Sequence, residues 1–241
     1  MDTAPLVPAR TDHLALPRPH VGASVLYAAL AAAYTGLLLA AERVYLLDLP
    51  YWVYEGAALR AKWLGVATGA AEAAALKGYP VPNSLSQAVL ALAVGPLGAA
   101  GAGKLLAVLV LLASFGAVYA LCVRVHGPAG VYRALVLAAT LGASAAYWNG
   151  YLNFQLGLAA LALYGAVRAR GGLAARPSPG VTAAFGVALF FCHFAPFFAF
   201  ALGAGLEALV RRDRRTVAAL VPAGVLSLWY VLARGAGDAA V

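Results

Sequence analysis

Long stretches without charge limit this chain more than any other feature of its sequence. Residues 21–41 contain no Asp, Glu, Lys or Arg. Because about 20 apolar residues in a helix cross the hydrocarbon core of a bilayer, such a stretch predicts a membrane-spanning helix. Over all 241 residues, 63% are hydrophobic and 11% are charged, against about 25% charged residues in a typical soluble domain. We therefore expect a polytopic membrane protein and not a soluble enzyme or a disordered chain.

Further apolar stretches follow the first one and leave no room for a large soluble domain. We predict an all-α, polytopic transmembrane bundle with about six or seven spans, built from residues 21–241 after a flexible cytoplasmic tail at residues 1–20. The stretch at residues 85–101 contains Pro96 and either spans the membrane or re-enters it. The other predicted spans are residues 104–123, 131–147, 151–167, 181–210 and 216–233.

Basic side chains gather at the ends of these stretches. The chain has 17 Lys plus Arg against 9 Asp plus Glu, a formal net charge of +8. At span ends these cations indicate membrane orientation, so we expect membrane lipids and no nucleic acid as partners. Two clusters, Arg168 to Arg176 and Arg211 to Arg215, flank residues 181–210, a stretch long enough to be kinked, strongly tilted or broken. Since the positive-inside rule puts both clusters in the cytoplasm, this stretch re-enters, or one cluster faces outward.

Residues 42–83 form the longest segment between two apolar stretches. We expect an external loop with short interfacial helices, because its Tyr and Trp side chains suit the depth of the lipid headgroups. Pro80 and Pro82 block a helix and predict a rigid turn, after which Asn83 or Ser84 can cap the next helix.

Asp48 is the leading candidate for chemistry, since it lies among apolar and aromatic residues just past the first span. Partial desolvation favours proton uptake by a carboxylate, which suits a general base. The alternative is a helix cap or an ordinary loop carboxylate. If Pro50 starts a helix, Glu55 lies in its second turn and the two acids could share a divalent cation or position an acceptor hydroxyl. Two carboxylates alone supply few ligands for a metal.

Basic residues of the same loop are candidates for holding a phosphate. Arg60, Lys62 and Lys77 carry the donors that bind phosphate oxygens, and the alternative is that their side chains reach to the membrane interface for solvation.

Three further polar residues lie near or within apolar stretches. Asn149 and Asn153 surround a tight turn and could bind hydroxyl groups at the mouth of a cavity, or could serve as turn and cap residues. His193 lies inside a predicted span, where ionisable groups are costly and often functional. It could contact substrate or relay a proton, or it could satisfy backbone groups that Pro196 leaves free.

These features together resemble the GT-C superfamily of membrane glycosyltransferases. The resemblance rests on an acidic residue after the first span, a proline-rich turn, a span that opens with Lys104, and two later motifs. The motifs are Asp48-Leu-Pro-Tyr-Trp, Tyr79-Pro-Val-Pro-Asn, Gly150-Tyr-Leu-Asn-Phe-Gln-Leu-Gly-Leu and His193-Phe-Ala-Pro-Phe-Phe-Ala-Phe.

The resemblance implies a multi-pass enzyme of a bacterial plasma membrane. It would transfer a sugar, with inversion, from a polyprenyl-phosphate donor to an extracytoplasmic acceptor. Asp48 matches the catalytic acidic residue of the family, and Arg60, Lys62 or Lys77 would hold the lipid phosphate. Family members commonly carry adjacent acidic residues in this loop, where this chain has Asp48 alone. They are also commonly longer, so the resemblance suggests an amino-terminal core or an inactive relative.

Two other functions remain open at this point. A non-catalytic subunit of a larger membrane complex is indicated by the small size and by Ala- and Gly-rich surfaces, which let helices approach closely in lipid. A lipid or solute transporter is indicated by helices that Pro96 and Pro196 interrupt.

Overall fold

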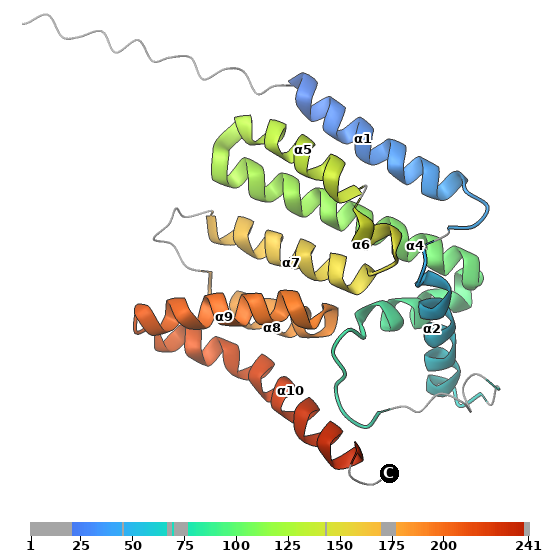
Figure 1. Ribbon diagram of the computed structural model, residues 1–241, viewed down its shortest axis with the longest axis vertical. Coiled ribbons are helices and arrows are strands. Elements are labelled where there is room, and N and C mark those ends of the chain that lie inside the picture. The colour runs from blue at the N-terminus through green and yellow to red at the C-terminus, as the bar shows by residue number, and fades with distance from the viewer. Residues whose placement is uncertain are drawn as a thin grey trace, which may run out of the picture.

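The computed structural model describes residues 21–44, 46–66, 69, 77–142, 144–169 and 177–238. Within these ranges every regular element is a helix (Figure 1), so the all-α prediction is confirmed. The predicted tail at residues 1–20 lies outside the described ranges. The helices are α1 (Val21–Ala40), α2 (Leu49–Trp63), α4 (Leu85–His126), the 3₁₀ turn η1 (Gly127–Ala129), α5 (Gly130–Gly142), α6 (Ala145–Trp148), α7 (Leu152–Arg168), α8 (Pro179–Cys192), α9 (Phe194–Val210) and α10 (Arg214–Asp238).

Three helical stretches among the described residues are long and apolar enough to cross a membrane. They are α1, the stretch Leu85–Ala138 and the stretch Arg214–Gly235. Helices α8 and α9 are apolar but shorter. The apolar stretches indicate a membrane protein, but the expected count of about six or seven spans is not confirmed. Helix α5, for example, has 13 residues and rises only about 20 Å.

Helix α4 is interrupted near its start. Pro96 lies within it, and Gly98 adopts φ 67° and ψ 175°, a conformation that a residue with a Cβ rarely takes. The chain changes direction there, and Figure 1 shows a short part before the break and a long part that runs back through the bundle. The apolar stretches predicted at residues 85–101 and 104–123 therefore belong to one helix, which is broken within the first of them.

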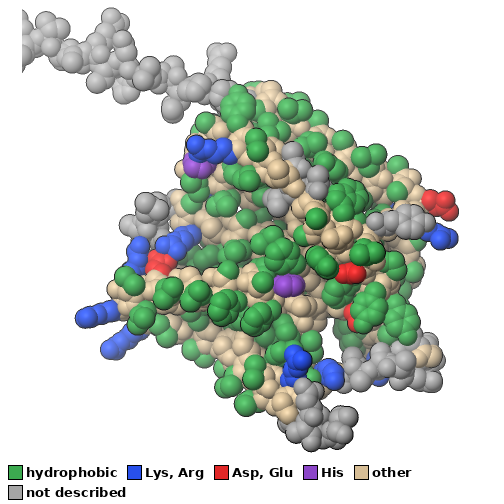
Figure 2. All heavy atoms as spheres, viewed as in Figure 1, with side chains coloured by type: hydrophobic (Ala, Val, Ile, Leu, Met, Phe, Trp, Pro, Cys, Tyr) green, Lys and Arg blue, Asp and Glu red, His purple; other side chains and the backbone are tan. Residues whose placement is uncertain are grey.

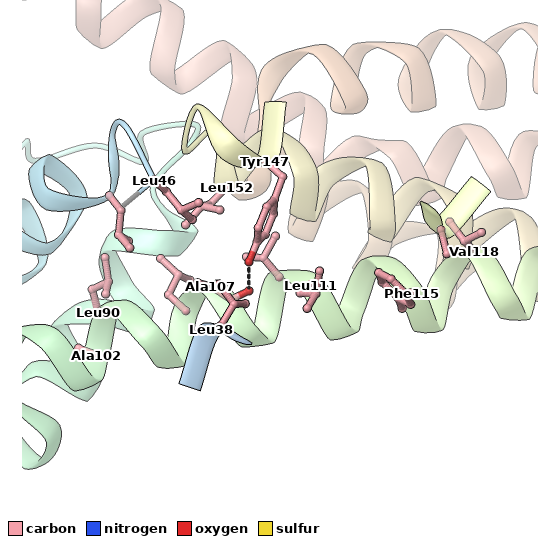
Figure 3. Packing of buried hydrophobic residues seen from close by; sticks show 14 of the residues in the cluster. Leu38, Leu46, Leu90, Ala102, Ala107, Leu111, Phe115, Val118, Tyr147 and Leu152 are labelled. Carbon is pink, nitrogen blue, oxygen red and sulfur yellow. Dashed lines mark hydrogen bonds between the residues drawn. The ribbon is translucent and has the colours of Figure 1, made fainter. Parts of the chain in front are cut away.

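The long part of α4 is the centre of the first hydrophobic core. It packs against α1, α5 and α7, and its side chains Leu106, Leu111 and Phe115 are almost fully buried. The hydroxyl of Tyr147 from α6 donates a hydrogen bond to the carbonyl of Ala107 at 3.0 Å (Figure 3). This bond satisfies a polar group that would be costly to bury alone.

Helices α8, α9 and α10 form a second core beside α7. Leu189, Phe190, Phe197 and Phe200 are buried there, and the rings of Phe190 and Phe197 meet edge to face. The predicted span at residues 181–210 is broken into α8 and α9 at His193, whose backbone is extended.

The break at His193 turns α8 and α9 into an antiparallel hairpin (Figure 1). Glu207 near the end of α9 forms ion pairs with Arg168, at the end of α7, and with Arg211, at 3.2 Å from Arg211 Nε. Arg168 and Arg211 therefore lie at the same end of the bundle, which removes the conflict between the two basic clusters. Arg170 and Arg176 lie outside the described residues.

Candidate functional site

Charged side chains gather at the two ends of the bundle. Figure 2 shows Lys and Arg near the ends of α7 and α9 and the start of α10, a mainly hydrophobic zone beside them, and a second charged group near α2. Of the predicted site residues, Glu55, Arg60 and Lys62 lie on α2, and Asp48 stands just before it.

A cavity of about 600 Å³ lies at this end and is called the polar cavity below. One face of α2, the segment from Lys77 to Ser84, the start of α4 and Phe191 of α8 form its walls. Its lining residues include three predicted site residues and several aromatic rings. They are Tyr51, Tyr54, Glu55, Ala58, Leu59, Lys62, Trp63, Lys77, Tyr79, Pro80, Val81, Ser84, Gln87, Ala88 and Phe191.

Local sequence explains why α2 presents this face. Pro50 stands at the first turn, where a helix tolerates a missing amide, and the helix begins at Leu49. Gly56 lies against α4, and an added Cβ there would come within 2.5 Å of the Leu90 Cβ. Gly56 thus permits close packing of α2 on α4, and Glu55 and Lys62 are turned toward the polar cavity.

Glu55 is held by two neighbours at the cavity wall. Gln87 donates to the Glu55 carboxylate at 3.0 Å, and the Tyr51 hydroxyl also donates to it. This hydrogen bond, together with the negative charge of Glu55, raises the pKa of Tyr51. The Gln87 Oε1 is buried and has no hydrogen-bond partner in the described structure. A ligand hydroxyl could supply the missing donor.

Lys62 and Lys77 line the same cavity as Glu55. One carboxylate, two ammonium groups and the rings of Tyr54 and Tyr79 therefore surround one space. Ammonium groups attract phosphate oxygens, a carboxylate accepts hydroxyl protons, and aromatic faces pack on apolar surfaces of a ring.

Arg60 is separated from this group. Its guanidinium donates to the Ala91 carbonyl at 3.3 Å and occupies the space beside Gly95, where a Cβ would collide with it. Of the three predicted phosphate-binding cations, the structure brings only Lys62 and Lys77 to the polar cavity.

Asp48 is half buried and stands just before α2, but it does not line the polar cavity. Its backbone amide donates to the Asn149 carbonyl at 3.3 Å, and its side chain makes no cap hydrogen bond. Gly150 packs directly on it, with φ 81° and no room for a Cβ. Asp48 and Glu55 are thus not brought into one cavity, and no group of three or more His, Cys, Asp or Glu that could hold a metal occurs among the described residues.

Asn153 is a buried connecting residue. Its Oδ1 accepts from the Ser86 amide at 3.0 Å and from the Ser86 hydroxyl at 2.7 Å, and its amide group donates to the Asn83 carbonyl. It is 2% exposed and lies away from the cavity lining, whereas Asn149 is an exposed turn residue.

His193 connects α8 to α9. Its Nδ1 accepts from the Ala195 amide at 3.1 Å, and its ring packs edge to face on Phe154. His193 thus satisfies a backbone amide in the first turn of α9, a different group from the carbonyl that Pro196 leaves free.

The roles of two residues, Gln87 in the cavity lining and Asn83 beside it, were not expected from the sequence. Gln87 orients Glu55, and Asn83 accepts a hydrogen bond from the Phe194 amide at the start of α9, 111 residues away. Asn83 or Ser84 was expected to cap the next helix, α4. Ser84 stands at the N-cap position of α4 without a side-chain cap hydrogen bond, whereas Asn83 binds the first amide of α9, whose N-cap is His193. No local sequence signal predicts that Gln87 binds Glu55 or that Asn83 binds Phe194, although a polar residue in a proline-rich turn is a feature that the sequence does show.

Over the described residues, the fold and the cavity define an all-helical protein with stretches long and apolar enough to cross a membrane and a polar site at one end of its bundle. Comparison with protein-family models, with curated proteins and with solved structures finds no match for this chain.

Proposed function

We propose that this protein is a GT-C-like membrane glycosyltransferase whose polar cavity binds a polyprenyl-phosphate sugar. The observation that carries the proposal is the meeting of Glu55, Lys62 and Lys77 in one cavity of about 600 Å³ at the end of an apolar bundle. A lipid-linked phosphate sugar needs an apolar phase for its tail, cations for its phosphate and acceptors for its hydroxyl groups.

Glu55 is the base in this proposal, in place of Asp48. Its carboxylate takes the proton of the acceptor hydroxyl while that oxygen bonds to the anomeric carbon of the sugar. The bond from that carbon to the phosphate oxygen breaks, and its electron pair leaves with the lipid phosphate. Attack from the face opposite the leaving group inverts the anomeric centre. Gln87 and Tyr51 hold the carboxylate in position.

Lys62 and Lys77 bind the phosphate and stabilise the charge that develops as it leaves. The unpaired Oε1 of Gln87 accepts a sugar hydroxyl, which removes the cost of a buried acceptor without a donor.

The charge distribution supports an extracytoplasmic cavity. The basic end of the bundle carries Arg168, Arg211 and Arg215, and the positive-inside rule places this end in the cytoplasm. The polar cavity lies at the other end, where an external acceptor can reach it.

A transfer assay with purified full-length protein and a polyprenyl-phosphate sugar tests the proposal. Glu55→Gln keeps the shape and removes the base, so we expect turnover to fall by roughly 10²–10⁴-fold. Lys62→Gln and Lys77→Gln should weaken donor binding. Glu42→Gln is the matched control, because Glu42 is an exposed carboxylate of the same segment.

The variant Asp48→Asn distinguishes whether Asp48 or Glu55 is the base. Full loss of transfer in Asp48→Asn with normal activity in Glu55→Gln would return the base role to Asp48. A folded wild-type protein that transfers no sugar from any polyprenyl-phosphate donor would contradict the whole proposal.

A further inference from the structure

A second hollow lies on the opposite face of α2 and has a different chemistry. It encloses about 490 Å³ and is called the apolar groove below. Leu49, Val53 and Ala57 of α2 face it, at the spacing of one helix face, whereas Tyr51, Glu55 and Lys62 face the polar cavity. Tyr54 stands between the two faces and lines both hollows.

The opposite wall of the groove is made of small residues just after the break in α4. Ala99, Ala100 and Gly103 line it, and a Cβ added at Gly103 would meet the Val53 side chain at 3.4 Å. The helices approach closely at Gly103, and the exposed Ala99 and Ala100 leave the space beside them open.

Two cations are the charged residues that line this groove. Arg43 is exposed on the segment after α1, and Lys104 donates one hydrogen bond, to the Leu39 carbonyl at 3.1 Å. An ammonium group has three donors, so Lys104 keeps two for a ligand. The guanidinium of Arg43 can bind two oxygens of one phosphate.

We propose that the apolar groove binds one anionic phospholipid, with an acyl chain along the Leu49 and Val53 face and its phosphate between Arg43 and Lys104. Hydration of an apolar surface is unfavourable, so an acyl chain that covers the groove is stabilised because it removes this surface from water. A zwitterionic lipid fills the same groove but brings no net negative charge to the two cations. This site is separate from the polar cavity and does not depend on the proposed transfer reaction.

Native mass spectrometry of the full chain in non-ionic detergent tests this site, with equal amounts of phosphatidylglycerol and phosphatidylcholine. We expect the wild type to retain one lipid with a preference for phosphatidylglycerol. Each basic residue near an anionic headgroup accounts for about fivefold, so Arg43→Gln lowers the preference about fivefold and Arg43→Gln/Lys104→Gln removes it. Ala100→Phe fills the groove and lowers retention of both lipids.

The matched control is Lys62→Gln/Lys77→Gln, which removes two cations from the other face of α2 and should leave the preference unchanged. Glycerol phosphate at millimolar concentration should not displace the lipid, because it has no acyl chain. Equal retention of both lipids by the wild type would overturn the proposal, as would a preference that persists in Arg43→Gln/Lys104→Gln. The proposal would also be overturned if Ala100→Phe retained as much lipid as the wild type, or if glycerol phosphate displaced the bound lipid. If Lys62→Gln/Lys77→Gln loses sugar transfer but retains the lipid, the polar cavity and the apolar groove act independently, as proposed.

Discussion

Gly150 allows the backbone of Asp48 to pack directly against the turn before α7. Its φ of 81° is unfavourable for a residue with a side chain, and an added Cβ would lie 2.7 Å from the Asp48 backbone nitrogen. The turn before α7 can therefore approach the segment before α2 closely enough for the Leu47 and Asp48 amides to donate to the Trp148 and Asn149 carbonyls. Backbone pairing, and not a charge, holds Asp48 at this place.

We expect Gly150→Ala to lower the free energy of unfolding by about 2–4 kcal/mol, because it adds both backbone strain and a steric collision. Thermal unfolding of the purified protein in detergent measures this change. Gly116→Ala is the control, since Gly116 lies in α4 with ordinary φ and open space around its Cα. Equal melting temperatures for the two variants would show that the close approach at Gly150 is not needed.

At the scale of elements, two asparagines join three helices near the polar cavity. Asn153 of α7 binds Ser86 at the start of α4, and Asn83 in the preceding turn binds both Asn153 and the start of α9. Asn83 has φ 64°, a conformation that asparagine tolerates better than most residues. These contacts fix one wall of the cavity, the segment that carries Tyr79 and Lys77.

Asn153→Ala should destabilise the protein by about 1–3 kcal/mol, because it leaves Ser86 and the Asn83 carbonyl without their partner. The same thermal unfolding experiment measures the loss. Asn149→Ala is the matched control at the neighbouring turn, since only the Asn149 backbone is used there. A loss of the same size in Asn149→Ala would argue that the turn itself, and not the connection between helices, stabilises this region.

At the scale of the whole molecule, the α8–α9 hairpin decides the side on which each charged segment lies. The contacts of Glu207 with Arg168 and Arg211 require the end of α7 and the end of α9 to lie together. The starts of α8 and α10 lie at that end too, and α2 lies at the other (Figure 1). The positive-inside rule can then be obeyed by both basic clusters.

Single cysteines test this arrangement with a membrane-impermeant maleimide on cells that express the protein. Gly180→Cys and Arg215→Cys, both exposed near the starts of α8 and α10, should react only after permeabilisation. Leu47→Cys, which is 75% exposed before α2, should react in intact cells. The natural Cys122 and Cys192 are buried and serve as the background.

Different labelling of Gly180→Cys and Arg215→Cys would contradict the hairpin. Protection of Leu47→Cys in intact cells would leave the hairpin untouched but would place the polar cavity in the cytoplasm, against the proposed transfer to an external acceptor.

Much of the element content could be predicted, because it depends on local sequence. The prolines at 80 and 82 indicated a turn without a helix, and α1 and α7 lie within one residue of their predicted spans. Helix α10 starts two residues before its predicted span and ends five residues after it. The predicted span at residues 131–147 was too long, because the structure divides this stretch between α5 and the short α6. Apolar composition alone does not show where a helix stops.

The site was predicted less well than the elements. Three predicted site residues, Glu55, Lys62 and Lys77, line one cavity. Arg60 instead binds a carbonyl of α4, and Asp48 lies outside the cavity lining. The direction of a side chain on α2 depends on which face packs against α4, and this contact is made by Gly56 and Leu90, far apart in the sequence.

By itself, the sequence determined that this protein is helical and suited to a bilayer, because long uncharged stretches favour helices that satisfy their own backbone in lipid. Only the tertiary structure decided which carboxylate faces the polar cavity, which asparagine binds the first amide of α9 and which basic ends lie together. Each of these depends on contacts between residues that are distant in the chain, such as Asn83 with Phe194 and Arg168 with Glu207. Such contacts arise from the packing of whole helices, and no local pattern of residues encodes them.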